Sequence, residues 1–107
     1  MTKRTVTMCS DPAHGWLRVN TKDIADLGIG EKVSAYSYLS SGGRITYLEE
    51  DSDATLYMKE AEKRGWEIEV KYKEHRGRSF IRNLPSYDAN WFKDKYMPWY
   101  LKSVSHA

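Results

Sequence analysis

Cysteine is almost absent from this 107-residue chain, which contains only Cys9. A disulfide within the chain is therefore excluded, as is a zinc site built from four cysteines. Long apolar runs are missing too, because the opening Met1-Thr2-Lys3-Arg4 leads into no hydrophobic segment. We expect no signal peptide, no membrane span and no membrane partner, and a reducing cytoplasm as the location.

Motifs of catalysis are scarce as well. The sequence contains no phosphate-binding loop, no nucleophile elbow and no glycine pattern for a dinucleotide. His14, His75 and His106 are far apart, and none has a partner at the spacing of a metal site. The sequence therefore predicts no catalytic residue, no metal ligand and no cofactor. His14 could act as a base or share a ligand role with the acidic residues 49–53, but a histidine in a turn more often braces the loop.

Large side chains, in contrast, are plentiful. Apolar residues make up 40% of the chain, and the 14 aromatic residues are four Trp, eight Tyr and two Phe. A chain of this length buries roughly two thirds of the surface that it exposes when unfolded, which is enough for one core without disulfides or metals. The composition therefore predicts one small globular domain and excludes a disordered chain.

The order of the periodic segments predicts an α+β fold. A short helix is expected from Thr21 to Leu27 and a longer one over 52–64, each followed by a glycine that ends it. β-Branched and alternating residues indicate strands at 4–9, 15–19, 33–39, 44–48, 66–73 and, less regularly, 79–82. Because strands follow one another directly, we expect a mostly antiparallel sheet of four to five strands with the longer helix packed on one face.

The strand at 66–73 has the strictest alternation of apolar and charged residues in the chain. Its charged residues are expected to face water, and its other face to lie on the core. The residues predicted to be buried are Trp66, Ile68, Val70 and Tyr72.

The composition changes after Pro85, which divides the chain into an α+β domain at 1–87 and an aromatic-rich, partly helical extension at 88–107. Asp88 is placed to cap a helix that reaches Met97, where Pro98 would interrupt it. The extension has more large side chains than we expect the core to need, so it is predicted to bind a partner or a second copy. The alternative is that it completes the core. The predicted partner-binding residues are Trp91, Phe92, Tyr96, Trp99 and Tyr100.

Charge is unevenly distributed, since residues 1–70 carry nine basic and twelve acidic side chains and residues 71–107 carry eight and three. Basic side chains beside aromatic rings are typical of nucleic-acid binding, and residues 71–82 have this pattern. The candidate nucleic-acid-binding residues are Lys71, Lys73, Arg76, Arg78 and Arg82. Two observations speak against this function: Tyr72 and Phe80 are expected to point inward, and a net charge of +2 is low for such a protein.

An acidic cluster precedes the longer helix and consists of Glu49, Glu50, Asp51 and Asp53. Carboxylates here complement the helix dipole and cap free amides, so we expect Asp51, Ser52 or Asp53 to cap the helix and not to bind a cation. A weaker alternative joins Asp51 or Asp53 with Glu69-Val70-Lys71, which is similar to the PD-(D/E)xK nucleases. In those enzymes two acids bind Mg²⁺ and the lysine steadies the attacking water.

Four short blocks, in order along the chain, carry a resemblance to a known group of proteins. They are Asp11-Pro12-Ala13-His14-Gly15-Trp16, Tyr36-Ser37-Tyr38, Tyr47 to Ala54, and Arg78 to Arg82. Over about residues 10–87 the chain resembles small proteins of bacteriophages and mobile elements that have the pattern DPGHGW…YSY…YLEEDCDA…RSRIR and no assigned function. It departs from that pattern at Ala13, Ser52 and Phe80.

The resemblance implies a biological context and no chemistry. Small phage accessory proteins commonly bind a host protein, and many inhibitors of CRISPR and other defence systems are single domains of this size. We therefore expect a non-enzymatic protein that binds an intracellular bacterial protein, for instance an inhibitor of a defence system such as CRISPR-Cas. The alternatives are a small nucleic-acid-binding module that uses residues 71–82 and, third, a metal-dependent nuclease-like enzyme. A homodimer is left open.

Overall fold

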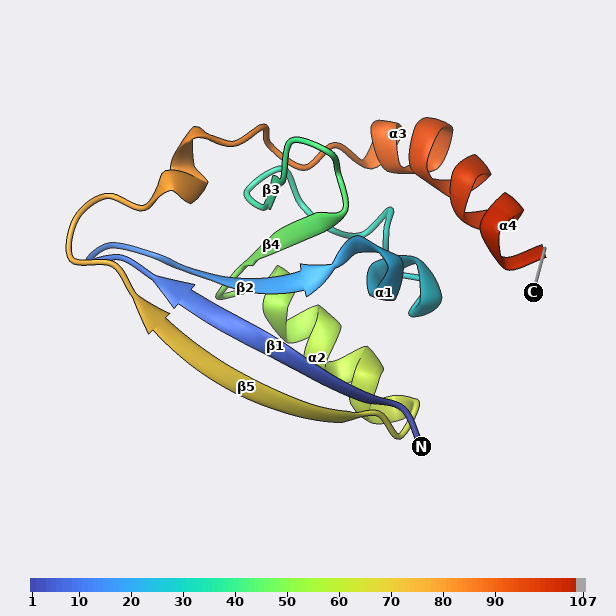
Figure 1. Ribbon diagram of the computed structural model, residues 1–107, viewed down its shortest axis with the longest axis horizontal. Helices are drawn as coiled ribbons and strands as arrows, with labels where there is room; N and C mark the ends of the chain where they lie inside the picture. Colours follow the sequence, from blue (N-terminus) through green and yellow to red (C-terminus); the bar gives the residue numbers. More distant parts are fainter. Residues whose placement is uncertain (106–107) are drawn as a thin grey trace.

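A five-stranded mixed sheet in the order β3-β4-β2-β1-β5 organises the chain (Figure 1). The computed structural model describes residues 1–105. The strands are β1 (Lys3–Ser10), β2 (Gly15–Asn20), β3 (Tyr38–Leu39), β4 (Ile45–Glu49) and β5 (Glu67–Glu74). The helical segments are α1 (Thr21–Asp26), α2 (Asp53–Lys63), the 3-10 turn η1 (Phe80–Asn83), α3 (Ala89–Trp91), the π-helical turn η2 (Phe92–Tyr96) and α4 (Met97–Ser105). The predicted single α+β domain is confirmed.

Three of the four strand pairings are antiparallel, as the sequence predicts, and one is not. β2 pairs with both β1 and β4, and β4 pairs with β3, always in the antiparallel sense. The chain then crosses through α2, and β5 pairs in parallel with β1 from Lys3↔Glu67 to Ser10↔Glu74. A helical crossover is what a parallel pair requires. β5 consequently forms one edge of the sheet.

Apolar side chains cover both faces of the sheet. The main cluster joins one face to α1, α2 and the C-terminal segment, and its largest fully buried members are Tyr57, Tyr87, Leu17, Ile24, Leu27, Ile29 and Leu48. A smaller cluster on the opposite face contains Cys9, Trp16, Tyr47 and Ile81. The second cluster places η1 against the sheet and so helps to shape the loops at this end.

Two of the predicted strands differ in the structure. Residues 33–37 form turns, and only Tyr38–Leu39 remains as β3, because the serine side chains of this stretch bond to a carboxylate of α2 and bend the chain. Residues 79–82 are not a strand, because Ser79 Oγ accepts a hydrogen bond from the Ile81 amide (3.2 Å) and starts the helical turn η1.

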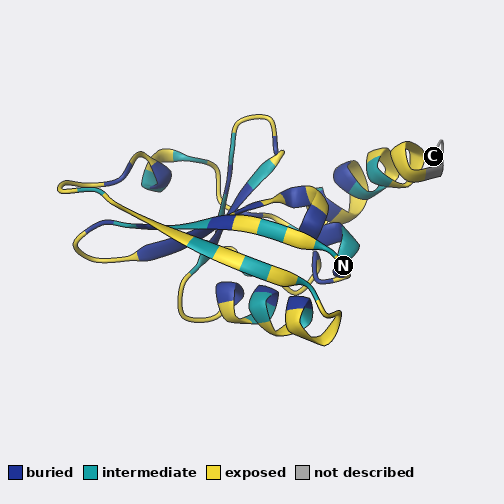
Figure 2. Cartoon of the chain, turned by 60° about the horizontal axis from the view of Figure 1, so that its bottom comes forward, coloured by how far each residue is buried: buried dark blue, intermediate teal, exposed yellow. Residues whose placement is uncertain are grey.

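The alternation predicted for residues 66–73 is confirmed for three of the four apolar residues. Trp66, Ile68 and Val70 are half-buried against the main cluster, while the charged residues between them are exposed (Figure 2). Tyr72 was predicted to be buried, and this is wrong, since its side chain is 79% exposed. β5 is an edge strand, so its last residues lack a neighbouring strand on one side.

The C-terminal helical segment starts as predicted but continues further. The Asp88 side chain accepts hydrogen bonds from the amides of Asn90 (2.8 Å) and Trp91 (3.4 Å) and so caps α3. Pro98 was expected to interrupt the helix, and this is wrong. The π-helical turn η2 ends just before α4, so Pro98 lies in the first turn of α4, where a proline is tolerated. No helix among residues 1–105 is long and apolar enough to cross a membrane.

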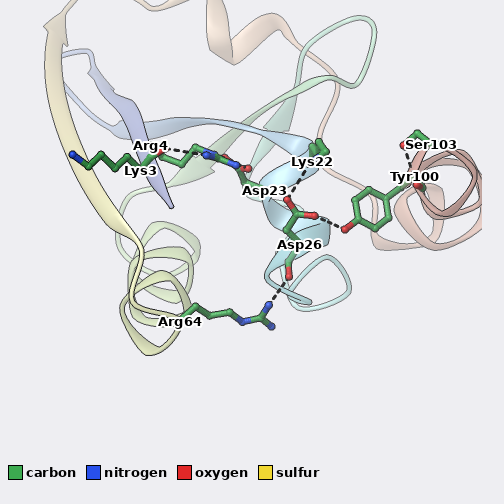
Figure 3. A network of polar contacts seen from close by, with 8 residues as sticks. All are labelled: Lys3, Arg4, Lys22, Asp23, Asp26, Arg64, Tyr100 and Ser103. Atoms are coloured by element: carbon green, nitrogen blue, oxygen red, sulfur yellow. Dashed lines mark hydrogen bonds and ion pairs between the residues drawn. The ribbon is translucent and has the colours of Figure 1, made fainter. Parts of the chain in front are cut away.

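The same segment is docked on the domain through both apolar and polar contacts. Phe92 and Tyr96 are buried with their rings stacked 5.5 Å apart, and the Phe92 ring fills the space that a side chain at position 30 would need. Figure 3 shows that the Tyr100 hydroxyl also reaches Asp26 in α1. This hydrogen bond raises the pKa of Tyr100 to about 12.

The alternative in which the extension completes the core therefore holds for part of it. Phe92 and Tyr96 were predicted to bind a partner, and they are core residues instead. Trp91 and Tyr100 are half-buried, and Trp99 is 52% exposed. The last two residues of the predicted extension, His106 among them, lie outside the described residues.

Candidate functional site

A pocket of about 570 Å³ opens where four segments far apart in sequence meet. It lies between the β1–β2 loop, the turns before β3, the end of β4 with the start of α2, and η1. The lining residues are His14, Gly15, Trp16, Ser34, Tyr36, Tyr38, Glu49, Asp51, Ser52 and Arg82. The volume is within the usual range for a ligand site, and aromatic and charged side chains converge in it.

Asp11 holds together two of the segments that line this pocket, the β1–β2 loop and η1. Its carboxylate accepts hydrogen bonds from the amides of Ala13 and His14 (both 3.0 Å), which closes the β1–β2 loop on itself. It also accepts from the Ser79 amide (3.2 Å) and from the guanidinium of Arg82 (2.7 and 2.9 Å). The Arg82 hydrogen bond holds the pKa of Asp11 well below its usual range. One carboxylate thus ties η1 to the β1–β2 loop.

Aromatic rings lie next to one another along the pocket, starting from His14. The Trp16 ring is 6.1 Å from the His14 ring and 6.2 Å from the Tyr38 ring, and the Arg82 guanidinium lies 5.5 Å from its centre. Trp16 itself is buried. Tyr36 lines the same pocket with a side chain that is 79% exposed. The pocket therefore has one buried aromatic ring, Trp16, and one largely exposed ring, Tyr36, in its lining.

Asp53 holds the segment that carries these tyrosines. Its Oδ2 accepts hydrogen bonds from the amide (3.0 Å) and hydroxyl (2.7 Å) of Ser34 and from the hydroxyl of Ser37 (2.6 Å). Ser37 Oγ in turn accepts from the Glu49 amide (2.9 Å). Asp53 is buried and engaged with these serines, so it neither caps α2 as predicted nor is free to bind a metal ion.

The side chain of Glu49, and not that of a predicted capping residue, bonds to the backbone just before α2. Its two carboxylate oxygens accept the amides of Asp51 and Ser52, each at 2.9 Å. Ser52 occupies the cap position of α2 without a side-chain hydrogen bond to the helix, so the predicted capping by Asp51, Ser52 or Asp53 is wrong. The Asp51 side chain remains exposed at the edge of the pocket.

The charges around the pocket leave a surplus of negative charge. The Arg82 cation is paired with Asp11, whereas Glu49 and Asp51 form none of the ion pairs found among residues 1–105. The start of α2 contributes only about half a positive charge through the helix dipole. Two carboxylates beside exposed aromatic surface suit a cationic group.

Four of the five predicted nucleic-acid-binding residues are exposed, and the fifth, Arg82, is paired within the fold. Lys71 and Lys73 are on an exposed face of β5, which they share with Glu67 and Glu69 of the same strand. Arg76 and Arg78 are exposed in the loop after β5. Arg82 is half-buried and paired with Asp11, so it is not available to a phosphate.

The nuclease-like arrangement is not assembled either. The Glu69 carboxylate accepts a hydrogen bond from Thr5 Oγ1 (3.3 Å) on β1, while Asp53 faces the serines before β3. Within the described chain no group of three or more His, Cys, Asp and Glu side chains is arranged to hold a metal ion. Burial raises the pKa of the Cys9 thiol, which fits a core residue better than a nucleophile.

Sequence reasoning identified some members of the pocket and missed how they meet. It noted that His14 could share a role with the acidic cluster, and His14, Glu49 and Asp51 do line one pocket. It missed Ser34 and Tyr36, because residues 33–39 were assigned to a strand. The signal that could have found them is the serine-rich sequence around Tyr36, which is typical of turns.

Comparison with known proteins adds no relative from which a function could be transferred. No protein family, no curated protein and no solved structure matches this chain.

Proposed function

We propose that this protein is a non-enzymatic binding protein whose pocket receives a basic side chain of a partner protein. The observation that carries the proposal is the pairing of aromatic rings with two carboxylates that no cation of residues 1–105 neutralises. Tyr36 is the key ring, because it lines the pocket and its largely exposed side chain leaves an aromatic face open to a cation.

The chemistry of an arginine or lysine side chain matches each part of the pocket. Its aliphatic stem can pack on Tyr36 and Tyr38, and its charged end can approach Glu49 and Asp51. A cation over an aromatic face contributes about 0.5–2 kcal/mol, depending on how much water is excluded. A guanidinium can in addition donate two parallel hydrogen bonds to one carboxylate, so we expect arginine to bind better than lysine.

The resemblance to phage and mobile-element proteins supports a bacterial cytoplasmic protein as the partner. A component of a defence system, such as a CRISPR-Cas effector, is the kind of target that we propose. The proposal of a non-enzymatic role rests on the same resemblance, because small phage accessory proteins commonly bind a host protein.

The direct test is a titration with small probes, followed by NMR chemical shifts or calorimetry. N-acetyl-arginine methylamide should bind in a saturable manner and shift the signals of the pocket residues. Tyr36→Ala and Asp51→Asn should each weaken binding several-fold. Tyr72→Ala and Asp94→Asn are matched controls, since Tyr72 is as exposed as Tyr36 and Asp94 is an exposed carboxylate elsewhere, and neither lines this pocket. Preferential binding of N-acetyl-glutamate methylamide or phosphate would refute the proposal.

The partner itself is tested by capture from bacterial lysate with the wild-type protein and the Tyr36→Ala, Asp51→Asn double variant. A protein that is retained by the first and lost with the second supports the proposed function. The experiment is repeated after nuclease treatment. If the captured material depends on nucleic acid, the alternative function as a nucleic-acid-binding module is favoured.

A further inference from the structure

The free edge of β5 has the features of a strand that can pair with another strand. β5 lies at the rim of the sheet (Figure 1) and pairs with β1 over eight consecutive residues without a bulge. Its sequence contains no proline. Edge pairing is usually prevented by bulges, prolines, short length or charged side chains, and of these β5 has only the charges, which are of both signs.

The backbone shows which residues offer hydrogen bonds at this edge. The amides of Glu67 and His75 donate to Thr2 and Ser10, at 2.9 and 2.7 Å, so odd-numbered residues point their polar groups toward β1. Successive residues of a strand alternate, and therefore Ile68, Val70 and Tyr72 point their amide and carbonyl groups outward. A partner strand would have to bond to these even-numbered residues.

The side chains of β5 have a pattern that complements itself. The sequence from position 67 to 73 is Glu-Ile-Glu-Val-Lys-Tyr-Lys, with Val70 at its centre. The two glutamates before Val70 and the two lysines after it are all exposed and lie on the same face of the strand. Turned by 180° about Val70, the strand places each glutamate where a lysine was.

We propose that β5 pairs with β5 of a second copy of this chain, antiparallel and around a two-fold axis at Val70. Val70 then lies opposite Val70 of the second copy, Glu69 opposite Lys71, and Glu67 opposite Lys73. The two five-stranded sheets join into one ten-stranded sheet. An interface of this kind is closed and uses the same surface of both copies, as most homodimers do.

The backbone and the charges select this register independently. Val70–Val70 and Ile68–Tyr72 pair outward-pointing residues and can exchange both hydrogen bonds. Glu69–Lys71 is then a non-hydrogen-bonded pair, the class in which facing side chains come closest. A register that places an even-numbered residue opposite an odd-numbered one leaves the outward-pointing amide and carbonyl groups without hydrogen-bond partners. The neighbouring allowed registers place Glu69 opposite Glu69 or Lys71 opposite Lys71, and like charges directly opposite are destabilising.

The same register gives the exposed Tyr72 a partner. Tyr72 lies on the face of β5 that carries Ile68 and Val70, which are half-buried. In the dimer its ring lies opposite Ile68 of the second copy, and aromatic–β-branched pairs across strands are favourable. The existing ion pair between Lys3 and Glu67 (3.4 Å) is largely exposed and competes little with the new contacts.

The test uses two charge variants that are complementary to each other. The first is Lys71→Glu with Lys73→Glu, and the second is Glu67→Lys with Glu69→Lys. Each variant alone faces like charges throughout and should be monomeric. An equimolar mixture places glutamates opposite lysines at every charged position and should form a heterodimer. Sedimentation velocity at low salt measures the size, and native mass spectrometry identifies the heterodimer.

Two controls keep the outcome specific. Lys93→Glu with Lys95→Glu changes the net charge as the first variant does, at exposed sites of η2, and should leave the wild-type dimer intact. Circular dichroism verifies that each variant is folded, which we expect because all four β5 positions are exposed. The proposal is overturned if the wild type is monomeric at submillimolar concentration. It is equally overturned if either variant alone dimerises as the wild type does, or if the mixture forms no heterodimer.

Discussion

Two buried carboxylates hold the loops of the candidate site in place. Asp11 gathers donors from the β1–β2 loop and η1, and Asp53 gathers donors from the turns before β3. Hydrogen bonds to an ionised group are stronger than neutral ones, so a single carboxylate can fix a segment that has no regular structure. The geometry of the pocket thus depends on residues that are barely accessible to a ligand.

The first prediction concerns the pH dependence of stability through Asp11. Because Arg82 lowers the pKa of Asp11 in the folded state, stability from this pair is present above the ordinary pKa of 3.8 and is lost as the pH falls below it. Asp11→Asn should be less stable than the wild type at pH 7, and the difference should shrink as the protein is acidified. Urea denaturation followed by tryptophan fluorescence at several pH values measures this.

Asp94→Asn is the control for this experiment, because it removes an exposed carboxylate from η2. It should change the free energy of unfolding by no more than about 0.5 kcal/mol. A difference between Asp11→Asn and the wild type that stays constant from neutral to acid pH would contradict the role given to Arg82.

Among the elements, the C-terminal helical segment has two roles along its length. Its first turns bury Phe92 and Tyr96, and its later turns expose Trp99 and Leu101 at 52% and 56%. The π-helical turn η2 contains the buried Phe92 and Tyr96, and α4, which contains the exposed residues, follows it directly. The first part stabilises the domain, and the second remains a surface that is open to other molecules.

The second prediction tests the docking of this element. A Cβ at Gly30 would lie 1.8 Å from the Phe92 ring, so Gly30→Ala should displace the segment and lower the free energy of unfolding by about 1–3 kcal/mol. Truncation after Tyr87 should cost more, since each buried aromatic that is removed costs about 3–5 kcal/mol. Chemical denaturation measures both changes.

Gly42→Ala is the matched control, because a Cβ at Gly42 meets nothing within 4 Å. It should leave the stability nearly unchanged. If the chain truncated after Tyr87 melts at the same temperature as the full chain, the segment is not part of the core.

For the whole molecule, the excess of basic residues after position 70 is distributed over several elements. The molecule measures 43 × 29 × 20 Å, and its basic residues after position 70 are spread over β5, the following loop and the C-terminal segment. Arg82 is neutralised by Asp11, and the lysines of β5 share their face of the strand with two glutamates. We therefore expect long-range attraction to a nucleic acid to be weak.

The third prediction follows from this distribution. Binding of a labelled oligonucleotide, measured by fluorescence anisotropy, should be weak at physiological salt and fall steeply as salt is raised. Arg76→Ala with Arg78→Ala should reduce the slope against log salt by about one unit for each phosphate that the variant no longer binds. Arg82→Ala should instead destabilise the fold. A nanomolar, sequence-dependent complex at physiological salt would favour the nucleic-acid-binding function.

The sequence by itself determined the elements whose causes are local. α2 is amphipathic and ends at Lys63, two residues before Gly65 with its φ of 72°, and α3 begins at the Asp88 cap. β1 and β2 follow from their β-branched and alternating residues. In these cases the physical cause acts within a few residues, so that periodicity, a cap or a positive φ is sufficient.

Only the tertiary structure decided the features that depend on distant partners. The parallel pairing of β5 with β1, the turns at 33–37 and the exposure of Tyr72 each follow from contacts across the fold. The pocket has the same origin, since His14 and Asp51 are separated by more than thirty positions in the chain and meet only because β2 pairs with β4. Hydrophobic patterns specify which face of a strand is buried, but they do not specify its neighbour, because every half-buried strand offers the same backbone groups.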